Sequence, residues 1–220
     1  MKNLSERKKR AKSIIKILKK LYPNSKTELN YNSDWELLVA VILSAQCTDK
    51  RVNEVTETLF KKYRKIDDYI KAKKDKFEQD IKSTGFYKNK TKNILEAAKV
   101  VKYNFGGEIP KTIEEMITIP GVARKTANVV LGELYGIYDG IAVDTHVRRF
   151  AIRFDLTDHR DPIRIEKDLM EVFQQKDWKY VNSGMVMYGR CICSARKHVC
   201  TNHPLTKIFP EASKNWPKSK

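Results

Sequence analysis

Ile119-Pro-Gly-Val-Ala-Arg-Lys-Thr-Ala-Asn-Val-Val-Leu131 is the most informative stretch of this chain, and Val143-Asp-Thr-His-Val-Arg-Arg149 follows shortly after it. A Pro-Gly turn between two helical patterns places backbone N–H groups at the start of the second helix. These donors and the helix dipole suit a phosphate oxygen. Binding of this kind positions a nucleic-acid strand without reading its bases. Most Pro-Gly turns merely connect helices, so the turn alone is weak evidence.

The same stretch carries a lysine in the first turn of the predicted helix. Lys125 follows Gly121 by four residues and precedes an apolar run. We therefore expect the helix dipole and partial burial to favour its neutral form, in which a lysine can act as a Schiff-base nucleophile. Asp144 comes nineteen residues later. It is expected to cap the next helix, and near a lysine it could stabilise positive charge on a sugar.

The charge of the chain favours a polyanionic partner. The 220 residues have a formal net charge of +17, and residues 1–26 hold ten Lys or Arg with Glu6 as their single acid. Nucleic acid and an anionic membrane surface both fit this charge, and a general bias towards lysine would also produce it. The apolar residues from Ala11 to Tyr22 are spaced as on an amphipathic helix, whose lysine face could contact DNA phosphates.

Other compositional features point to an intracellular, soluble protein of the cytoplasm or nucleoid. The N-terminus lacks the apolar core and cleavage site of a signal peptide. The most apolar run, residues 35–45, has about half the ~20 residues that a membrane span needs. Four irregularly spaced cysteines do not form a secreted disulfide framework.

Helical periodicity and capping residues predict an all-α chain with no strand. Capping residues are expected at Ser33, Thr48, Thr112, Asp144 and Asp161. One helix is predicted within residues 1–26. The other predicted helices cover residues 34–46, 49–63, 75–83, 90–104, 113–119, 123–135, a segment after 144, a segment from 162, and 178–190.

Nearly the whole chain resembles the endonuclease III family of helix-hairpin-helix DNA glycosylases. The resemblance is carried by the hairpin, by Leu37-Leu-Val-Ala-Val-Ile-Leu-Ser-Ala-Gln-Cys-Thr-Asp49, by Gly85-Phe-Tyr87 and by Tyr188-Gly-Arg190. It implies two helical lobes with a DNA-binding cleft between them. Residues 28–137 would form a helical barrel with the hairpin at about 112–135. Residues 1–27 and 138–220 would form the second lobe.

The resemblance also implies a bifunctional DNA glycosylase and AP lyase that acts as a monomer on damaged duplex DNA. The residue matching Lys125 attacks C1′, the base leaves, and β-elimination breaks the strand. Asp144 matches the aspartate that assists it. Monofunctional relatives lack the lysine, so Lys125 favours the bifunctional branch and excision of oxidised pyrimidines. A uracil or thymine mismatch glycosylase remains an alternative, as does a non-catalytic DNA-binding protein. A membrane-surface protein would leave the hairpin unexplained.

Further positions are expected to contact DNA by the same resemblance. Gln46 would enter the gap left by the flipped nucleotide, Phe86 would wedge against the opposite strand, and His146 would lie near the DNA. A helix-terminal amide, a core aromatic and a surface histidine are the ordinary alternatives. The hairpin residues expected to bind phosphate are Pro120, Gly121, Val122, Ala123 and Arg124. The family has glycine at position 123, but alanine fits helical φ and keeps its N–H, so we expect phosphate binding to survive.

The C-terminal loop departs from the family. Most members hold a [4Fe–4S] cluster by Cys-x6-Cys-x2-Cys-x5-Cys, and a cluster normally takes four thiolates. The matching positions here are Cys193, Cys200, His203 and Phe209. We therefore expect a retained loop without cluster or other cofactor, packed around Phe209. A zinc site of Cys193, Cys200 and His203, with Cys191 nearby, is the alternative. The loop keeps three basic residues for DNA: Arg196, Lys197 and Lys207.

Overall fold

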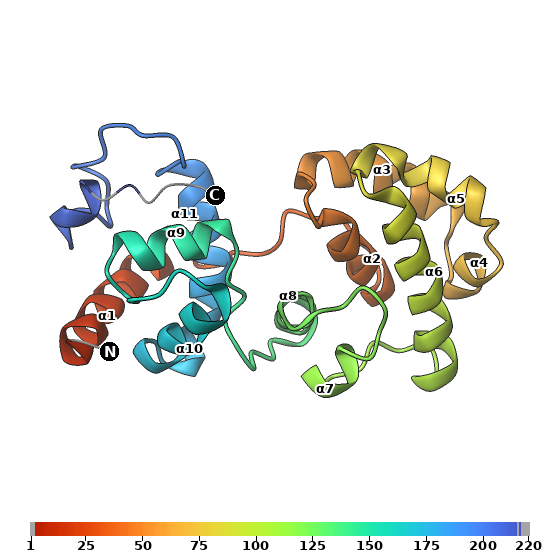
Figure 1. The fold of residues 1–220 in the computed structure, drawn as a ribbon, viewed down its shortest axis with the longest axis horizontal. Coiled ribbons are helices and arrows are strands. Elements are labelled where there is room, and N and C mark those ends of the chain that lie inside the picture. Colours follow the sequence, from red (N-terminus) through yellow and green to blue (C-terminus); the bar gives the residue numbers. More distant parts are fainter. Residues whose placement is uncertain (1–2, 215, 217–220) are drawn as a thin grey trace. The chain divides into compact units, whose positions relative to one another are not determined.

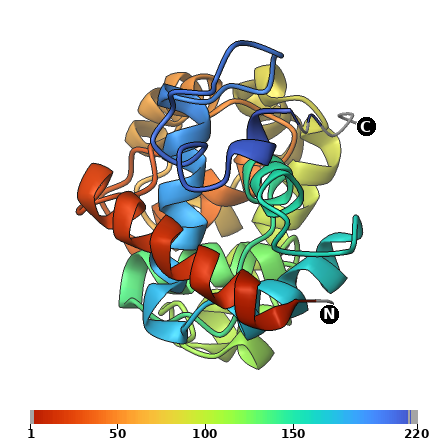
Figure 2. The ribbon, with the colours of Figure 1, turned by 90° about the vertical axis from the view of Figure 1, so that its left-hand side faces the viewer.

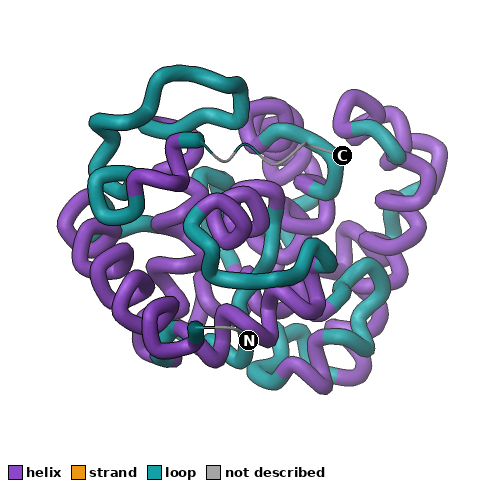
Figure 3. Tube along the Cα trace, turned by 60° about the vertical axis from the view of Figure 1, so that its left-hand side comes forward, coloured by secondary structure: helices purple, strands orange, loops and turns teal. Residues whose placement is uncertain are grey.

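The computed structural model describes residues 3–214 and Trp216. This part of the chain consists of helices and loops and has no strand (Figure 3), which confirms the all-α fold. Two compact units form: a central unit, Thr27–Ile137, and a terminal unit made of Met1–Lys26 and Tyr138–Lys220 (Figure 1). Each has its own hydrophobic core. None of the described helices has the length and apolarity needed to cross a membrane.

The central unit packs around one buried helix. Its elements are α2 (Asp34–Ser44), α3 (Asp49–Lys62), α4 (Ile66–Ile70), α5 (Lys74–Ile81), the 3-10 turn η1 (Lys82–Thr84), α6 (Tyr87–Asn104), α7 (Ile113–Met116) and α8 (Arg124–Tyr135). Helix α2 contacts α3, α6 and α8. Every residue from Trp35 to Leu43 is buried, because the helix is apolar nearly all round. Ser33 caps it by accepting a hydrogen bond from the Glu36 N–H.

The terminal unit combines an N-terminal segment with the C-terminal third of the chain. It contains α1 (Leu4–Leu21), α9 (Thr145–Arg153), α10 (Pro162–Val172), the 3-10 turn η2 (Gln175–Asp177), the π-helical turn η3 (Tyr180–Gly184), α11 (Met185–Cys191) and the 3-10 turn η4 (Pro210–Ser213). Helix α1 packs against α10 and η3, and α9 packs against α11 and η4. In Figure 2, α1 crosses the near side of this unit and the C-terminal loop lies at its top.

Helix α1 is amphipathic as predicted, but two of its basic residues do not belong to the solvated face. Arg7 is buried and its guanidinium bonds to Asp155 and Asp158 at 2.8 and 2.7 Å. Arg10 bonds to the backbone carbonyl of Phe154 at 2.7 Å and to Asp155. Part of the N-terminal charge is therefore paired within the terminal unit and is not available to a partner.

The helix predicted over 178–190 is confirmed, and it contains the π-helical turn η3 directly before α11. One short helix was missed. Helix α4 was not predicted, because it spans only five residues and so offers too few for a periodicity to show. Tyr69 of this helix is fully buried, and its ring contacts the rings of Trp35 and Phe77. Tertiary packing, and not a local sequence pattern, therefore holds α4 in place.

Candidate active site and C-terminal loop

The hairpin turn is built around a glycine that no other residue could replace. The Val122 N–H donates to the Ile119 carbonyl at 3.0 Å, which closes a turn with Pro120 and Gly121 in its centre. Gly121 has φ +83°. A Cβ placed on it would lie 2.9 Å from the Cβ of Asn93, so both backbone conformation and space require glycine. The turn thus lies close against Asn93 of α6.

The start of α8 is formed by exposed residues. Ala123 is the N-cap residue, with φ −89° and ψ 167°. As expected, Ala123 has a negative φ and needs no glycine, although its ψ is extended and not helical. The Ala123 carbonyl accepts from the Ala127 N–H at 3.0 Å, which opens the helix. Val122 is buried, whereas Ala123 and Arg124 are exposed. The first N–H groups of a helix have no intrahelical acceptor, so this end can bind an anion.

Lys125 lies on the exposed side of α8. Ala127, Val130 and Leu131 of the same helix are fully buried in the central core, while Lys125 itself is exposed. The partial burial expected from the apolar run was therefore wrong. Those residues lie on the opposite face of the helix from the lysine, so their hydrophobicity does not cover it. The side chain is open to a substrate that approaches the N-terminus of α8.

Gln46 and Phe86 share a rare backbone conformation. Gln46 follows α2 with φ +53°, and Phe86 precedes α6 with φ +49°. The left-handed region is uncommon for residues other than glycine, and such residues concentrate at functional sites. Phe86 is 63% exposed, so the ordinary alternative of a core aromatic was wrong for it. Both side chains project from loops, as DNA-inserting residues would need to.

A buried lysine ties these two loops together. The Lys90 ammonium donates to the Leu43 carbonyl and to the Thr84 carbonyl, each at 2.8 Å. Leu43 lies three residues before Gln46, and Thr84 lies two residues before Phe86. Burial lowers the pKa of Lys90. Sequence reasoning missed this residue, because nothing local distinguishes it from the other lysines of its segment.

Asp144 and His146 lie together at the first turn of α9, in the terminal unit. Asp144 caps that helix as predicted, since its Oδ1 accepts from the Val147 N–H at 2.8 Å. Its side chain is half-buried. His146 packs against the backbone of α11 at Gly189, where a Cβ would collide with the His146 ring and lie 2.8 Å from Nη2 of Arg149. Glycine at this position therefore makes room for the histidine.

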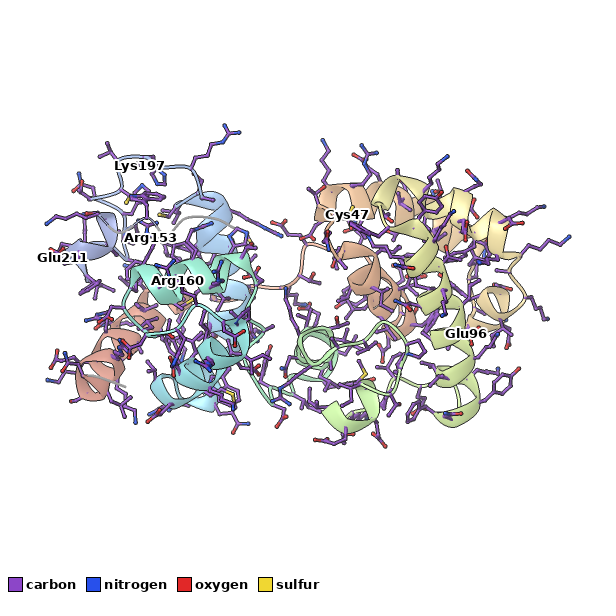
Figure 4. All side chains as sticks on the ribbon, viewed as in Figure 1. Cys47, Glu96, Arg153, Arg160, Lys197 and Glu211 are labelled. Atoms are coloured by element: carbon purple, nitrogen blue, oxygen red, sulfur yellow. The ribbon has the colours of Figure 1, made fainter. Side chains whose placement is uncertain are left out.

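The C-terminal loop does not fit a [4Fe–4S] cluster. Cys193 and Cys200 are the buried thiols of the loop, and both hydrogen-bond the guanidinium of Arg153, at 3.0 and 3.2 Å from their Sγ atoms. Arg153 is fully buried beneath the loop, with Lys197 at the loop's outer edge (Figure 4). Four thiolates are needed, and the remaining cluster positions are His203 and Phe209. Phe209 instead packs under Arg10.

A second group of side chains in the loop was not foreseen in full. Ligand atoms of Cys193, His198 and His203 all lie within 4.8 Å of one another. His198 was missed because it matches no cluster position of the family. Burial raises the pKa of the Cys193 thiol, and the hydrogen bond from Arg153 opposes that rise. Burial, with His198 and Arg153 nearby, lowers the pKa of His203.

Comparison with known proteins agrees with this fold and hairpin. Residues 39–175 match the model of the HhH-GPD superfamily base excision DNA repair protein, which defines the class. The endonuclease III of Synechocystis is 46% identical over 96% of this chain and 97% of its own. That of Bacillus subtilis is 41% identical over 88% of this chain and 89% of its own. A solved non-covalent endonuclease III–DNA complex superposes with a TM-score of 0.86 at 38% identity, covering 94% of this chain and 97% of that one.

The chain belongs to the endonuclease III family. Its activity is therefore that of a DNA glycosylase and AP lyase in base excision repair.

Proposed function

We propose that this enzyme excises oxidised pyrimidines from duplex DNA and cleaves the resulting abasic strand through Lys125. The carrying observation is an exposed lysine in the first turn of a helix whose N-terminus can bind phosphate. A relative that is 38% identical to this chain has been solved as a trapped endonuclease III–DNA covalent intermediate. A covalent intermediate requires a nucleophile, and an amine at this position supplies one.

The proposed reaction begins with the Lys125 amine attacking C1′ of the damaged nucleotide. The N-glycosidic bond breaks and the base leaves with a proton. The C1′–O4′ bond of the sugar then opens, O4′ takes up a proton from the amine, and an imine forms between Nζ and C1′. Removal of a C2′ proton drives β-elimination, which breaks the C3′–O bond, and hydrolysis of the imine releases Lys125. The Asp144 carboxylate would stabilise the positive charge that develops on the sugar.

We assign capture of the damaged nucleotide to the loops that carry Gln46 and Phe86, which both have a left-handed backbone conformation. Phe86, exposed at the start of α6, would wedge against the opposite strand, and Gln46 would fill the vacated stack. Flipping a nucleotide costs about a few kcal/mol, and side chains that fill the gap offset part of that cost. His146 and the backbone at Pro120–Arg124 would contact the strand. A basic loop with Arg196, Lys197 and Lys207 would add phosphate contacts, so affinity should fall steeply with salt.

The reaction as written requires no metal or redox group, and we propose that this chain works without an iron–sulfur cluster. Cys193 and Cys200, which match two of the family's cluster ligands, accept hydrogen bonds from Arg153. Phe209, which matches another, has no atom that can bind iron. The enzyme would act as a monomer on intracellular DNA.

The test uses a duplex with one thymine glycol and, in parallel, a duplex with one abasic site. Each is incubated with the wild type, with Lys125→Gln and with Lys99→Gln, in the presence and absence of borohydride. Lys99 is the matched control, because its side chain pairs with Glu96 on the surface of α6. We expect nicking and a trapped adduct with wild type and Lys99→Gln, and neither with Lys125→Gln.

Other outcomes would redirect the proposal. An adduct on the abasic duplex alone would keep the lyase and assign the enzyme to other lesions, with uracil and thymine mismatches tested next. Tight, salt-sensitive binding without an adduct on either duplex would contradict the lysine mechanism and support a non-catalytic DNA-binding protein.

A further inference from the structure

Four potential metal ligands gather in an eleven-residue stretch of the C-terminal loop, residues 193–203. Ligand atoms of Cys193, His198 and His203 lie within 4.8 Å of one another. Cys200 lies near Cys193, because the Sγ atoms of both residues accept hydrogen bonds from the same guanidinium. Two of these four, Cys193 and Cys200, are buried. His198 belongs to no position of the family's cluster pattern, so the group differs from the inherited site.

The ring of His198 is oriented as a metal ligand would be. Its Nδ1 lies 2.6 Å from the backbone carbonyl of Arg196. A carbonyl can only accept, so Nδ1 carries the proton and Nε2 keeps a free lone pair. Metal-binding histidines are usually held by such a bond from the other ring nitrogen. Nε2 is buried and has no hydrogen-bond partner among the described residues.

His203 also has a ring nitrogen without a hydrogen-bond partner among the described residues. Its Nδ1 is buried and likewise has no partner within the described part of the chain. The two imidazole rings lie with centroids 5.2 Å apart, and Trp216 packs edge-on against His198 at 5.1 Å. A buried polar atom without a hydrogen-bond partner destabilises the folded state. A metal ion bound by His198, His203 and the buried thiol of Cys193 would give both ring nitrogens a partner.

The two cysteine sulfurs of the group are held by a common hydrogen-bond donor, Arg153. Arg153 donates to Cys193 and Cys200 from one edge of its guanidinium and to the Ala212 carbonyl at 2.8 Å. Both sulfurs therefore lie beside one guanidinium. Arg153 thus contacts the two sulfurs. The ligand atoms of His198 and His203 lie within 4.8 Å of the Cys193 Sγ.

We propose that Cys193, Cys200, His198 and His203 bind one zinc ion in this loop. Two thiolates and two imidazoles make a neutral tetrahedral zinc site of a common type. Tetrahedral bonds of about 2.3 Å to sulfur and 2.0 Å to nitrogen place ligand atoms about 3.3–3.8 Å apart. The ligand atoms of Cys193, His198 and His203 need to approach one another by only about 1 Å to reach that geometry, and Cys200 Sγ would complete the set. The ion would tie together the loop that carries Arg196 and Lys197.

The donor set selects zinc over the alternatives. A [4Fe–4S] cluster needs four thiolates, and calcium and magnesium need oxygen ligands. Mixed sulfur and nitrogen donors suit zinc, and cobalt can replace it as a coloured probe of tetrahedral geometry.

The test measures metal in the full-length chain, produced in cells supplied with both iron and zinc. We expect about one zinc per chain and only traces of iron. The metal is then removed with a chelator and Co²⁺ is added. We expect the intense visible bands of tetrahedral cobalt and a near-ultraviolet thiolate-to-cobalt band. Thermal unfolding should shift to lower temperature on metal removal and recover when Zn²⁺ is returned.

Matched variants separate ligation from general damage. Cys193→Ser and His198→Ala should lose the metal and the cobalt spectrum, and Cys200→Ser should weaken the thiolate band. Two controls should keep both: Cys191→Ser, which changes an exposed thiol of the same region, and His159→Ala, whose imidazole pairs with Asp168 instead. Should Cys193→Ser fail to fold, His198→Ala still decides, since His198 is only half-buried.

Several results would overturn the proposal. Absence of stoichiometric metal together with no tetrahedral cobalt spectrum would do so. Four irons per chain would show the family's cluster instead. Equal metal loss in Cys191→Ser would show a different ligand set. None of these readouts depends on catalysis, so failure here leaves the Lys125 mechanism untouched.

Discussion

The guanidinium of Arg10 lies 3.8 Å from the centre of the Phe209 ring. This contact joins α1 to the C-terminal loop at the position where the family places its last cluster ligand. Arg10 is held there by the Phe154 and Asp155 carbonyls, at 2.7 and 2.8 Å. A cation over an aromatic face contributes about 0.5–2 kcal/mol, depending on how far it is removed from water.

Replacing Phe209 with alanine should therefore loosen the end of the chain. We expect Phe209→Ala to lower the free energy of unfolding by about 1–3 kcal/mol, from lost apolar packing and the lost cation–π contact. Tyr103→Ala removes an aromatic ring that is 72% exposed and should change little. Thermal unfolding of the two variants measures the difference. Equal melting temperatures would show that Phe209 does not hold the loop.

Gly189→Ala should displace His146. The added Cβ would collide with the imidazole and lie 3.1 Å from Cε2 of Phe150. Gly184→Ala is the matched control, because its Cβ would lie 3.4 Å from the Cβ of Leu18, an ordinary contact. We expect Gly189→Ala to weaken binding to an abasic duplex at least ten-fold, which corresponds to about 1.4 kcal/mol. Gly184→Ala should bind like the wild type, and similar loss in both would point to general destabilisation of α11.

Lys90→Met should uncouple the loops of Gln46 and Phe86. Methionine fills the space but leaves the Leu43 and Thr84 carbonyls unpaired, at about 1–3 kcal/mol each. An abasic nucleotide flips at lower cost than a paired one. Excision of thymine glycol should therefore fall more than nicking of an abasic duplex. Lys92→Met, an exposed position on the same helix, serves as control. Equal losses on both substrates would contradict a positioning role.

Ionisation of Tyr135 should lower the free energy of unfolding at alkaline pH. Burial, aided by its hydrogen bond to Asp34, raises its pKa from 10 to about 12. The folded state therefore favours the neutral phenol. The stabilisation is fully present below pH 10 and disappears as the pH rises from 10 towards 12. Chemical denaturation at several pH values should show a steeper alkaline decline for wild type than for Tyr135→Phe. Parallel curves would show that Tyr135 is not the group responsible.

Local chemistry made the helix starts predictable. Ser33, Thr48, Thr112, Asp144 and Asp161 all cap helices as expected, since a capping side chain bonds a backbone N–H only three residues away. The positions of Lys125 and Asp144 followed from a family pattern. Whether they perform the chemistry remains a prediction.

Long-range contacts could not be predicted in the same way. Lys90 acts between residues 43 and 84, and Arg153 bonds thiols 40 and 47 residues further along the chain. Neither has a local signature, because a buried cation is defined by the carbonyls or sulfurs around it. Exposure of Lys125 was misjudged for a related reason: an apolar run covers one face of a helix and leaves the other to solvent.

The order in which the chain is synthesised gives the two units different folding histories. Residues 27–137 are continuous, so the hairpin and its core can close while translation proceeds. Helix α1 is made first, yet the acidic partners of Arg7 and Arg10 lie about 145–151 residues further along. During that interval residues 4–21 lack both their acidic and their apolar partners. The nascent chain therefore exposes this basic segment at least until residues 155–158 have been made, and a ribosome that stalls before that point would leave it exposed.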